Sequence, residues 1–246
     1  MSTTQQHDLR DQKALVTGAT SGLGRAIAFQ LVRDGAEVIV HGRDAARGIE
    51  TVEAIAAAGG QARFVAADLS NPTDLGRLVE VVGDVDILVN NAGFSWFGAT
   101  AELTITTFDA LFASNVRAAY FLVAAFAPGM AARGKDSIIN VSSMAGQIGL
   151  AGSAAYGATK AALSSMTRSW AAEFSPSGVR VNAIAPGPVY TGGAAPERIE
   201  ALGTTTLLNR AANAEEIAEV VGFLVSPRAS YVTGAIVAAN GGRTAI

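Results

Sequence analysis

The sequence of 246 residues contains no cysteine, so it has no disulfides and no metal site built from thiolates. Its only histidines, His7 and His41, are too few and too far apart to indicate a zinc site, and no metal site is predicted. Charged residues make up only 16% of the chain, and the formal net charge is −3. Nucleic-acid-binding proteins need a basic surface, so no nucleic-acid partner is predicted.

The sequence also lacks an obvious leader and a long apolar span. The first residues, Met1 to Asp8, are polar and contain no apolar stretch of the kind found in a signal peptide. The longest strongly apolar run, residues 118–132, is short for a membrane span and contains Pro128 and Gly129. We therefore expect a soluble, cytoplasmic protein with no membrane partner.

Apolar residues are abundant, at half of the chain, and they follow two alternating patterns. Short apolar runs predict buried strands, and the segments between them have helical periodicity. Such alternation predicts an α/β fold, a parallel sheet covered by helices on both faces. No linker or repeat divides the chain, so residues 12–246 are expected to form one domain after a flexible tail over residues 1–11. The expected strands are 13–17, 37–41, 62–66, 86–90, 137–142, 179–185 and 235–239, and the main expected helices are 44–58, 72–82, 104–130, 153–174, 196–201 and 214–224.

The loop Thr17-Gly-Ala-Thr-Ser-Gly-Leu-Gly24 lies between the first strand and a helix that ends at Gly35. Glycines at this place let the backbone turn sharply and approach a pyrophosphate, which the helix N-terminus stabilises. The spacing Gly-x-x-x-Gly-x-Gly differs from the commoner Gly-x-Gly-x-x-Gly, and no Gly-Lys-Ser/Thr follows, so this is not a Walker loop. A glycine-rich turn without a ligand is the alternative.

Three side chains suggest acid-base chemistry. Tyr156 and Lys160 are four residues apart, so on a helix they lie on one face. Ser143 follows a predicted strand and can hold a reacting oxygen by a hydrogen bond. A close ammonium favours a phenolate, so Lys160 is expected to lower the pKa of Tyr156. The set suits proton exchange with a carbonyl or an alcohol, although Tyr-x-x-x-Lys alone also occurs on ordinary helix surfaces.

Together these motifs resemble the short-chain dehydrogenase/reductase (SDR) family over nearly the whole chain, near its 3-oxoacyl-[acyl-carrier-protein] reductase-like members. The motifs that agree in order and spacing are Thr17-Gly18-x3-Gly22-x-Gly24, Asn90-Asn91-Ala92-Gly93, Ser143, Tyr156-x3-Lys160 and Pro186-Gly187-x-Val189-x-Thr191. The resemblance implies a single-domain Rossmann-like fold, a doubly wound sheet of about seven parallel strands. It also implies an oxidoreductase that transfers a hydride between a nicotinamide cofactor and a carbonyl/alcohol pair.

The resemblance further assigns roles to individual residues. Tyr156 would be the acid-base, Lys160 would lower its pKa and hold the nicotinamide ribose, and Ser143 would orient the substrate oxygen. Asn115 would help to hold a water that links Lys160 to solvent, or it would only relieve a helix kink. Asp68 would bind the adenine amino group, or it would only cap a helix. The expected cofactor-binding residues are Gly18, Thr20, Ser21, Gly22, Leu23, Gly24, Arg43, Asp68, Leu69, Asn91, Ala92, Gly93, Tyr156, Lys160, Pro186, Gly187, Val189 and Thr191.

The residues after the second strand favour NADP(H) over NAD(H). Gly42 stands where NAD-preferring members carry an acidic side chain, and Arg43 follows it, suited to a 2′-phosphate. His41 either adds to this basic patch or packs on the sheet. Asp44 is expected to cap the next helix rather than turn toward the cofactor.

The expected substrate is a small-molecule ketone or alcohol, because the expected pocket walls, 94–97, 144–150 and 187–206, are mostly apolar. A medium-sized ketone or a 3-oxoacyl thioester fits them better than a polar sugar. The resemblance also implies a homotetramer, with a dimer as the alternative. An NAD-dependent alcohol dehydrogenase and a non-catalytic nucleotide-sensing protein are the competing hypotheses. The expected substrate-binding residues are Trp96, Ser143, Met144, Gln147, Tyr156 and Tyr190.

Overall fold

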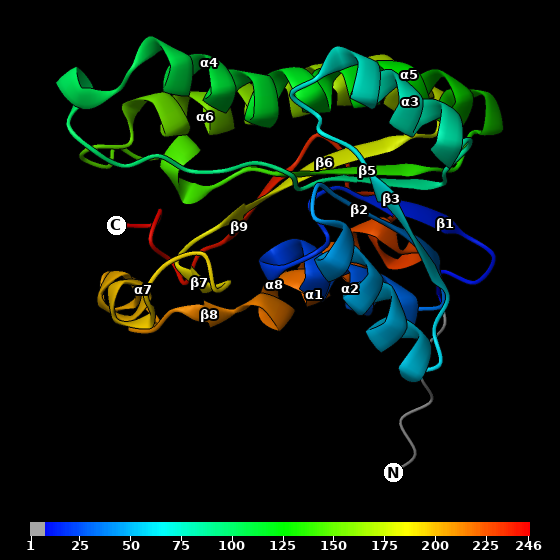
Figure 1. Cartoon of the computed structure of the whole chain (residues 1–246), viewed down its shortest axis with the longest axis horizontal. Coiled ribbons are helices and arrows are strands. Elements are labelled where there is room, and N and C mark those ends of the chain that lie inside the picture. The colour runs from blue at the N-terminus through cyan, green and yellow to red at the C-terminus, as the bar shows by residue number, and fades with distance from the viewer. Residues whose placement is uncertain (1–7) are drawn as a thin grey trace.

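One sheet of seven parallel strands runs through the protein (Figure 1), whose computed structural model describes residues 8–246. Its strands are β1 (Lys13–Val16), β2 (Glu37–Gly42), β3 (Ala62–Ala66), β4 (Ile87–Asn90), β5 (Ser137–Val141), β6 (Arg180–Pro186) and β9 (Ile236–Ala239). They lie in the order β3-β2-β1-β4-β5-β6-β9, and all pair in parallel, as the alternating pattern predicted.

Helices cover both faces of the sheet (Figure 1). Helices α1, α2 and α8 pack on one face, and α3, α5 and α6 pack on the other. Helix α6 packs into this second core through a stripe of four side chains, Leu163, Met166, Trp170 and Phe174. The helices are α1 (Gly22–Arg33), α2 (Ala45–Ala57), α3 (Pro72–Val82), α4 (Ile105–Phe112), α5 (Ala118–Arg133), α6 (Ala154–Phe174), α7 (Pro196–Gly203) and α8 (Ala214–Val225).

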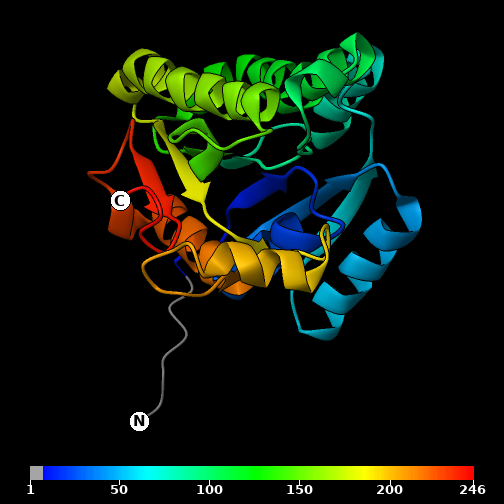
Figure 2. The ribbon, with the colours of Figure 1, turned by 90° about the vertical axis from the view of Figure 1, so that its left-hand side faces the viewer.

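The strand order reverses beside β1, and this reversal positions the site. Strand β1 pairs with β2 on one side and with β4 on the other, so the crossovers leave in opposite directions. A crevice therefore opens outside the carboxyl ends of these strands, where open α/β sheets bind ligands. Figure 2 looks toward this end of the molecule, with α7 in the foreground.

Side chains cap the starts of several helices, and Asp44 does so as predicted. The Asp44 carboxylate accepts a hydrogen bond from the Arg47 N–H at the start of α2. Asn213 and Glu216 form a capping box at the start of α8. Asp44 is therefore held as an N-cap.

The long helix expected over residues 104–130 is interrupted. Helix α4 ends at Phe112, a π-helical turn (η2, Ala113–Arg117) follows, and α5 runs to Arg133. The combined stretch 105–133 is long and apolar enough to cross a membrane by composition, but α5 packs one face into the second core. Helix α5 is therefore packed as a core helix of a folded domain is.

Two further features differ from the predictions. Residues 1–7 of the predicted tail lie outside the described residues, but Leu9 is fully buried and its N–H donates to the Asp34 carbonyl. The tail is therefore not loose over residues 8–11. Strands β7 (Val189–Tyr190) and β8 (Ala212–Asn213) form a small second sheet that was not predicted, because each has only two residues.

Candidate active site

A pocket of about 890 Å³ occupies the crevice at the carboxyl ends of the strands. It is lined by the glycine loop, the ends of β2, β3, β4, β5 and β6, the start of α6, and α7. Every residue predicted to bind the cofactor contributes to this lining. The folded chain therefore brings the whole predicted cofactor set to one surface.

The glycine loop has the backbone that its sequence requires. Gly18 and Gly22 have φ values of +66° and +52°, a left-handed region that side chains rarely adopt. A β-carbon at Gly24 would collide with the Gly18 carbonyl oxygen and the Asn91 side-chain amide. No side chain caps the N-terminus of α1, so its first N–H groups stay available.

Hydrogen bonds fasten this loop to the end of β4. The Thr17 hydroxyl accepts bonds from the N–H groups of Asn91 (2.9 Å) and Ala92 (3.0 Å). The Asn91 side-chain amide donates to the Thr17 carbonyl at 2.8 Å. The loop is thus fixed before any ligand arrives, which lowers the entropic cost of binding.

His41 helps to hold the glycine loop in place and does not add positive charge to the pocket. Its ring is buried; Nδ1 accepts a bond from the Gly18 N–H at 3.3 Å, and Nε2 lies 3.2 Å from the Ala67 carbonyl oxygen. Burial lowers the pKa of His41 to about 4, so the ring is neutral at pH 7. Of the two predicted alternatives, packing on the sheet is correct and the added positive charge is not.

The end of the pocket that lies beside β2 and β3 carries charges of both signs. Arg43 and Asp68 both line it, and Arg43 contributes to the lowered pKa of Asp68, after the larger effect of bonds from Ser70. Arg47, which the sequence analysis missed, also lines this end and bonds to Asp44 at 2.8 Å. A second arginine only four residues after Arg43, in the first turn of α2, was the available signal.

Tyr156 and Ser143 lie together at the opposite end. Tyr156 stands in the first turn of α6, and Ser143 precedes a short 3-10 helix (η3, Met144–Gly146). Burial raises the pKa of Tyr156, and a side-chain hydrogen bond with Ser143 lowers it to a smaller extent. The expected lowering of this pKa by Lys160 is therefore not observed in the protein alone.

The position of Lys160 explains this difference. Its side chain is buried, and Nζ donates to the Val141 carbonyl at 2.8 Å and lies 5.9 Å from the centre of the Tyr156 ring. Burial lowers the pKa of Lys160 to about 8, so the ammonium form still predominates at pH 7. The ammonium is therefore engaged by the Val141 carbonyl at the pocket wall.

Asn115 lies in the π-helical turn and does not line the pocket. Its side chain accepts a bond from the Phe94 N–H (3.0 Å) and donates to the Phe94 carbonyl (2.9 Å) and to Thr159 (3.1 Å). A β-carbon on Gly93 would come within 2.6 Å of the Asn115 Oδ1. Asn115 thus fixes the chain after β4 beside Lys160, and its proposed water remains a prediction.

The predicted substrate residues divide into two groups. Ser143, Met144 and Tyr156 line the pocket, as do Phe94, Phe97 and Leu150 from the expected walls. The structure does not place Trp96, Gln147 or Tyr190 in this lining: the Trp96 ring lies against Gly98, Gln147 is exposed, and Tyr190 is 38% exposed. Because these three side chains lie outside the lining, their contacts with a substrate remain predictions.

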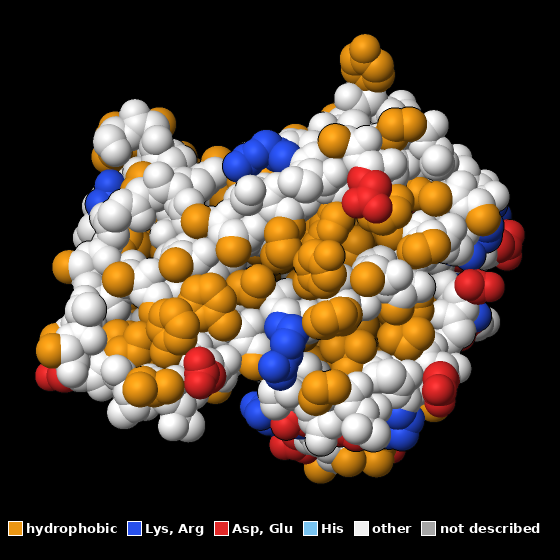
Figure 3. Space-filling view, turned by 90° about the horizontal axis from the view of Figure 1, so that it is seen from above, with side chains coloured by type: hydrophobic (Ala, Val, Ile, Leu, Met, Phe, Trp, Pro, Cys, Tyr) orange, Lys and Arg blue, Asp and Glu red, His pale blue; other side chains and the backbone are white. Residues whose placement is uncertain are grey.

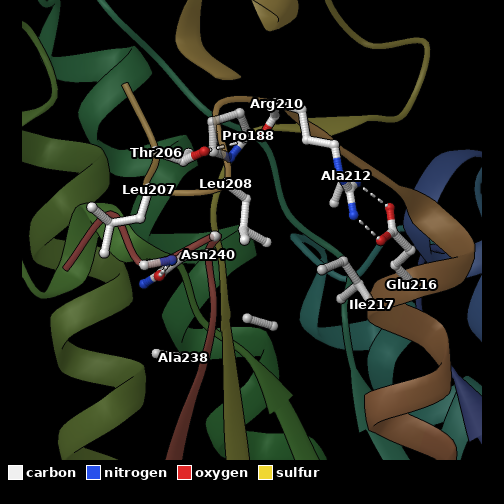
Figure 4. Close-up of a pocket in the computed structure, with 13 residues that line it drawn as sticks. Pro188, Thr206, Leu207, Leu208, Arg210, Ala212, Glu216, Ile217, Ala238 and Asn240 are labelled. Atoms are coloured by element: carbon white, nitrogen blue, oxygen red, sulfur yellow. Dashed lines mark hydrogen bonds and ion pairs between the residues drawn. The ribbon is translucent and has the colours of Figure 1, made fainter. Parts of the chain in front are cut away.

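A second, adjoining pocket of about 430 Å³ lies near the C-terminus (Figure 4). Leu207, Leu208 and Ile217 give it an apolar lining, and Arg210 forms an ion pair with Glu216 at its edge. Pro188 lines both pockets. The second pocket contains none of the predicted catalytic residues, so the larger one is the candidate active site.

The larger pocket fits a nicotinamide dinucleotide. The absence of a side chain at Gly18 and Gly24 lets the glycine loop pack tightly against itself and against Asn91 and Ala92, and the free N–H groups of α1 suit a pyrophosphate. Lys160 and the strip Pro186, Gly187 and Val189 lie toward the end that holds Tyr156. These residues would hold the phosphates and the nicotinamide half of such a cofactor.

Comparisons with known proteins agree with this geometry. The family described as Enoyl-(Acyl carrier protein) reductase matches residues 18–244. A solved structure described as a short chain dehydrogenase/reductase family protein is 48% identical, with a TM-score of 0.90, and the match covers 97% of this chain and 100% of that one. The angucycline C-6 ketoreductase LanV, solved with bound NADP, is 35% identical, with a TM-score of 0.89, over 97% of this chain and 98% of that one. Cyclopentanol dehydrogenase from Comamonas sp. (strain NCIMB 9872) is 34% identical over 246 residues, 96% of this chain and 98% of its own length.

Proposed function

The chain belongs to the short-chain dehydrogenase/reductase family, and from this we propose that it reduces a medium-sized, mainly apolar ketone with NADPH, or oxidises the matching secondary alcohol with NADP⁺. The family makes it an oxidoreductase that acts on hydroxyl or carbonyl groups. The observation that carries the finer proposal is the contact between the Tyr156 and Ser143 side chains beside the buried Lys160.

Tyr156, Ser143 and Lys160 have separate roles in ketone reduction. NADPH, when bound, supplies the hydride. Tyr156 donates its phenolic proton to the substrate oxygen, and Ser143 holds that oxygen by a hydrogen bond. Because burial raises the pKa of Tyr156, the phenol keeps its proton at neutral pH, the state that reduction requires. Lys160, still mostly an ammonium at pH 7, stabilises the phenolate that remains after proton transfer.

The adenosine end of the pocket supports NADP(H) over NAD(H). Gly42 packs against the Thr20 side chain and carries no acidic group that would repel a 2′-phosphate, and Arg43 is exposed beside it. Asp44 is engaged as the α2 N-cap with Arg47, so it does not compete for the ribose. The similarity to LanV, a ketoreductase with bound NADP, supports the same choice.

Replacing Arg43 with alanine is expected to raise the KM for NADPH by about tenfold or more and to leave the KM for NADH within about twofold. A charge-assisted bond to the 2′-phosphate would be lost, and NADH has no such phosphate. Steady-state titration with both cofactors measures this, and the exposed Arg10, replaced by alanine, is the control. Equal losses for both cofactors would favour the alternative, an NAD-dependent dehydrogenase.

The walls near Tyr156 support an apolar substrate body. Phe94, Phe97, Met144 and Leu150 line this region, and the Phe97 ring lies 5.6 Å from the Tyr156 ring. The relative named cyclopentanol dehydrogenase supports a ring ketone as the first substrate to test. A screen that follows NADPH oxidation with cyclic ketones, diketones, 3-oxo esters and quinones tests the proposal, and turnover of none of them would refute it.

The proposed assembly is a homotetramer, with a dimer as the alternative, built through the layer that contains α4, α5 and α6. Apolar side chains gather on this face (Figure 3). Ile105, Phe108, Tyr120 and Phe121 are each at least 43% exposed there. Exposed apolar groups of this size usually mark a contact surface.

Replacing Phe121 with glutamate is therefore expected to shift the protein toward a smaller oligomer, because the new charge would be buried at the contact. Light scattering coupled to size-exclusion chromatography measures the mass. The matched control is Ile49→Glu, an equally exposed apolar residue on α2. If both variants keep the mass of the unmodified protein, this helix layer is not the interface.

A further inference from the structure

Helix α7 places an arginine at the substrate end of the pocket. Arg198, Ile199 and Leu202 are its residues that line the pocket. Arg198 and Leu202 are four residues apart and so share one face of the helix. From this placement we propose that Arg198 determines specificity by binding a carboxylate on the substrate, so that the preferred substrates are oxo acids with an apolar body. The inference rests on the ketone reduction proposed above.

The guanidinium of Arg198 lies where it can reach a substrate held at Tyr156. Its central carbon is 5.4 Å from the centre of the Phe97 ring, and that ring is 5.6 Å from the Tyr156 ring. Phe97 therefore bridges the arginine and the acid-base residue. A guanidinium over an aromatic ring uses its face for the ring, which leaves its N–H edge to bind a carboxylate in a bidentate manner.

The charge of Arg198 is not neutralised by the protein. Within residues 8–246, Arg198 forms no ion pair, and its helix neighbours Glu197 and Glu200 are at spacings that do not face it. Arg210 provides the contrast, because both of its terminal nitrogens bond to Glu216, at 2.7 and 2.8 Å (Figure 4). The N–H donors of the Arg198 guanidinium are therefore available to a ligand.

The distribution of charge along the pocket also favours an anion at this end. Its acidic lining residues are Asp44 and Asp68, and both lie at the adenosine end, beside Arg47 and Arg43. The charged lining residues toward Tyr156 are Lys160 and Arg198, both cationic. A substrate carboxylate would therefore meet attraction without an opposing carboxylate.

The apolar surroundings define the rest of the substrate. Leu202, Phe97 and Leu150 line the same region and suit a hydrocarbon ring or chain between the carbonyl and the carboxylate. The carbonyl would lie at Tyr156 and Ser143, and the carboxylate would lie toward α7. A neutral ketone of the same shape would fit the walls but leave Arg198 without its partner.

A matched pair of substrates tests the proposal by kinetics. The probes are 4-oxocyclohexanecarboxylate and its methyl ester, which differ chiefly in charge. In Arg198→Gln, the KM for the carboxylate is expected to rise by about tenfold or more, and the KM for the ester to stay within about twofold. Arg198→Lys should recover part of the loss because it keeps the charge. Arg10→Gln is the matched control.

A binding measurement gives a second readout that needs no turnover. Calorimetry on the NADP⁺-loaded protein compares cyclohexanecarboxylate with cyclohexanecarboxamide. We expect the carboxylate to bind more tightly to the unmodified protein, and Arg198→Gln to remove that preference.

Several outcomes would overturn the inference. Equal effects of Arg198→Gln on the carboxylate and the ester would make Arg198 a structural part of α7. A rise in the KM for NADPH alone would assign Arg198 to a cofactor phosphate. No carboxylate preference in calorimetry would also refute it. Failure of the unmodified protein to reduce either ketone would instead count against the proposed function, and the calorimetry would still decide the role of Arg198.

Discussion

Replacing Tyr156 with phenylalanine is expected to lower kcat for ketone reduction by about 10²–10⁴-fold, the usual contribution of a positioned acid-base group. The substitution removes one oxygen atom and keeps the ring that packs against Phe97. The cofactor dissociation constant should stay within about threefold, because the glycine loop and its bonds to Asn91 are untouched. Single-turnover kinetics and NADPH fluorescence titration measure the two quantities separately.

The control for this prediction is Tyr231→Phe, because Tyr231 is fully exposed and does not line the pocket. It should retain the kcat of the unmodified protein. Full turnover in Tyr156→Phe, with NADPH still bound, would show that another group donates the proton. It would also revive the hypothesis of a nucleotide-sensing protein.

Replacing Gly24 with alanine is expected to weaken NADPH binding by about 10–100-fold. The added β-carbon would collide with the Gly18 carbonyl oxygen and the Asn91 side-chain amide. Overpacking of this kind costs about 1–3 kcal/mol, and backbone atoms cannot move aside as a flexible side chain can. The glycine loop would have to shift, and the cradle for the phosphates would shift with it. Fluorescence titration with NADPH measures the affinity, and thermal denaturation measures the stability.

Gly76 offers a matched control in helix α3. A β-carbon there would meet no atom within 4 Å, and the position is exposed. Gly76→Ala should leave NADPH binding unchanged and raise stability by about 0.5–1 kcal/mol, the ordinary gain from alanine in a helix. If Gly24→Ala binds NADPH as tightly as Gly76→Ala does, the loop does not form the phosphate cradle.

The sequence predicted the sheet, the order of its elements and the residues around the cofactor pocket. These features depend on patterns that are local in the chain: apolar runs for strands, capping residues such as Asp44 for helix starts, and glycines where only a left-handed backbone fits. The two-residue strands β7 and β8 lie below the length at which such a pattern can be recognised. The π-helical turn that contains Asn115 gave no periodic signal either.

The loop side chains were the least predictable part of the site. Trp96 and Phe97 are neighbours in an apolar segment, but only Phe97 faces the pocket, and Trp96 packs on Gly98. The pKa of Tyr156 is raised, whereas the sequence predicted that Lys160 would lower it. Burial raises this pKa by more than the hydrogen bond with Ser143 lowers it, and Lys160 is not among the groups that shift it. The spacing of residues in a sequence does not show in which direction a loop side chain points or how deeply a side chain is buried.

The sequence alone determined that the chain has a parallel sheet, a glycine cradle and a Ser, Tyr and Lys set, since each depends on residue types at fixed short spacings. Only the tertiary structure decided which side chains meet across long distances in the chain. Arg198 over Phe97, and His41 between Gly18 and Ala67, are such meetings. The physical reason is that such contacts, and the burial that sets their charges, exist only when the packed sheet and helices bring distant segments together.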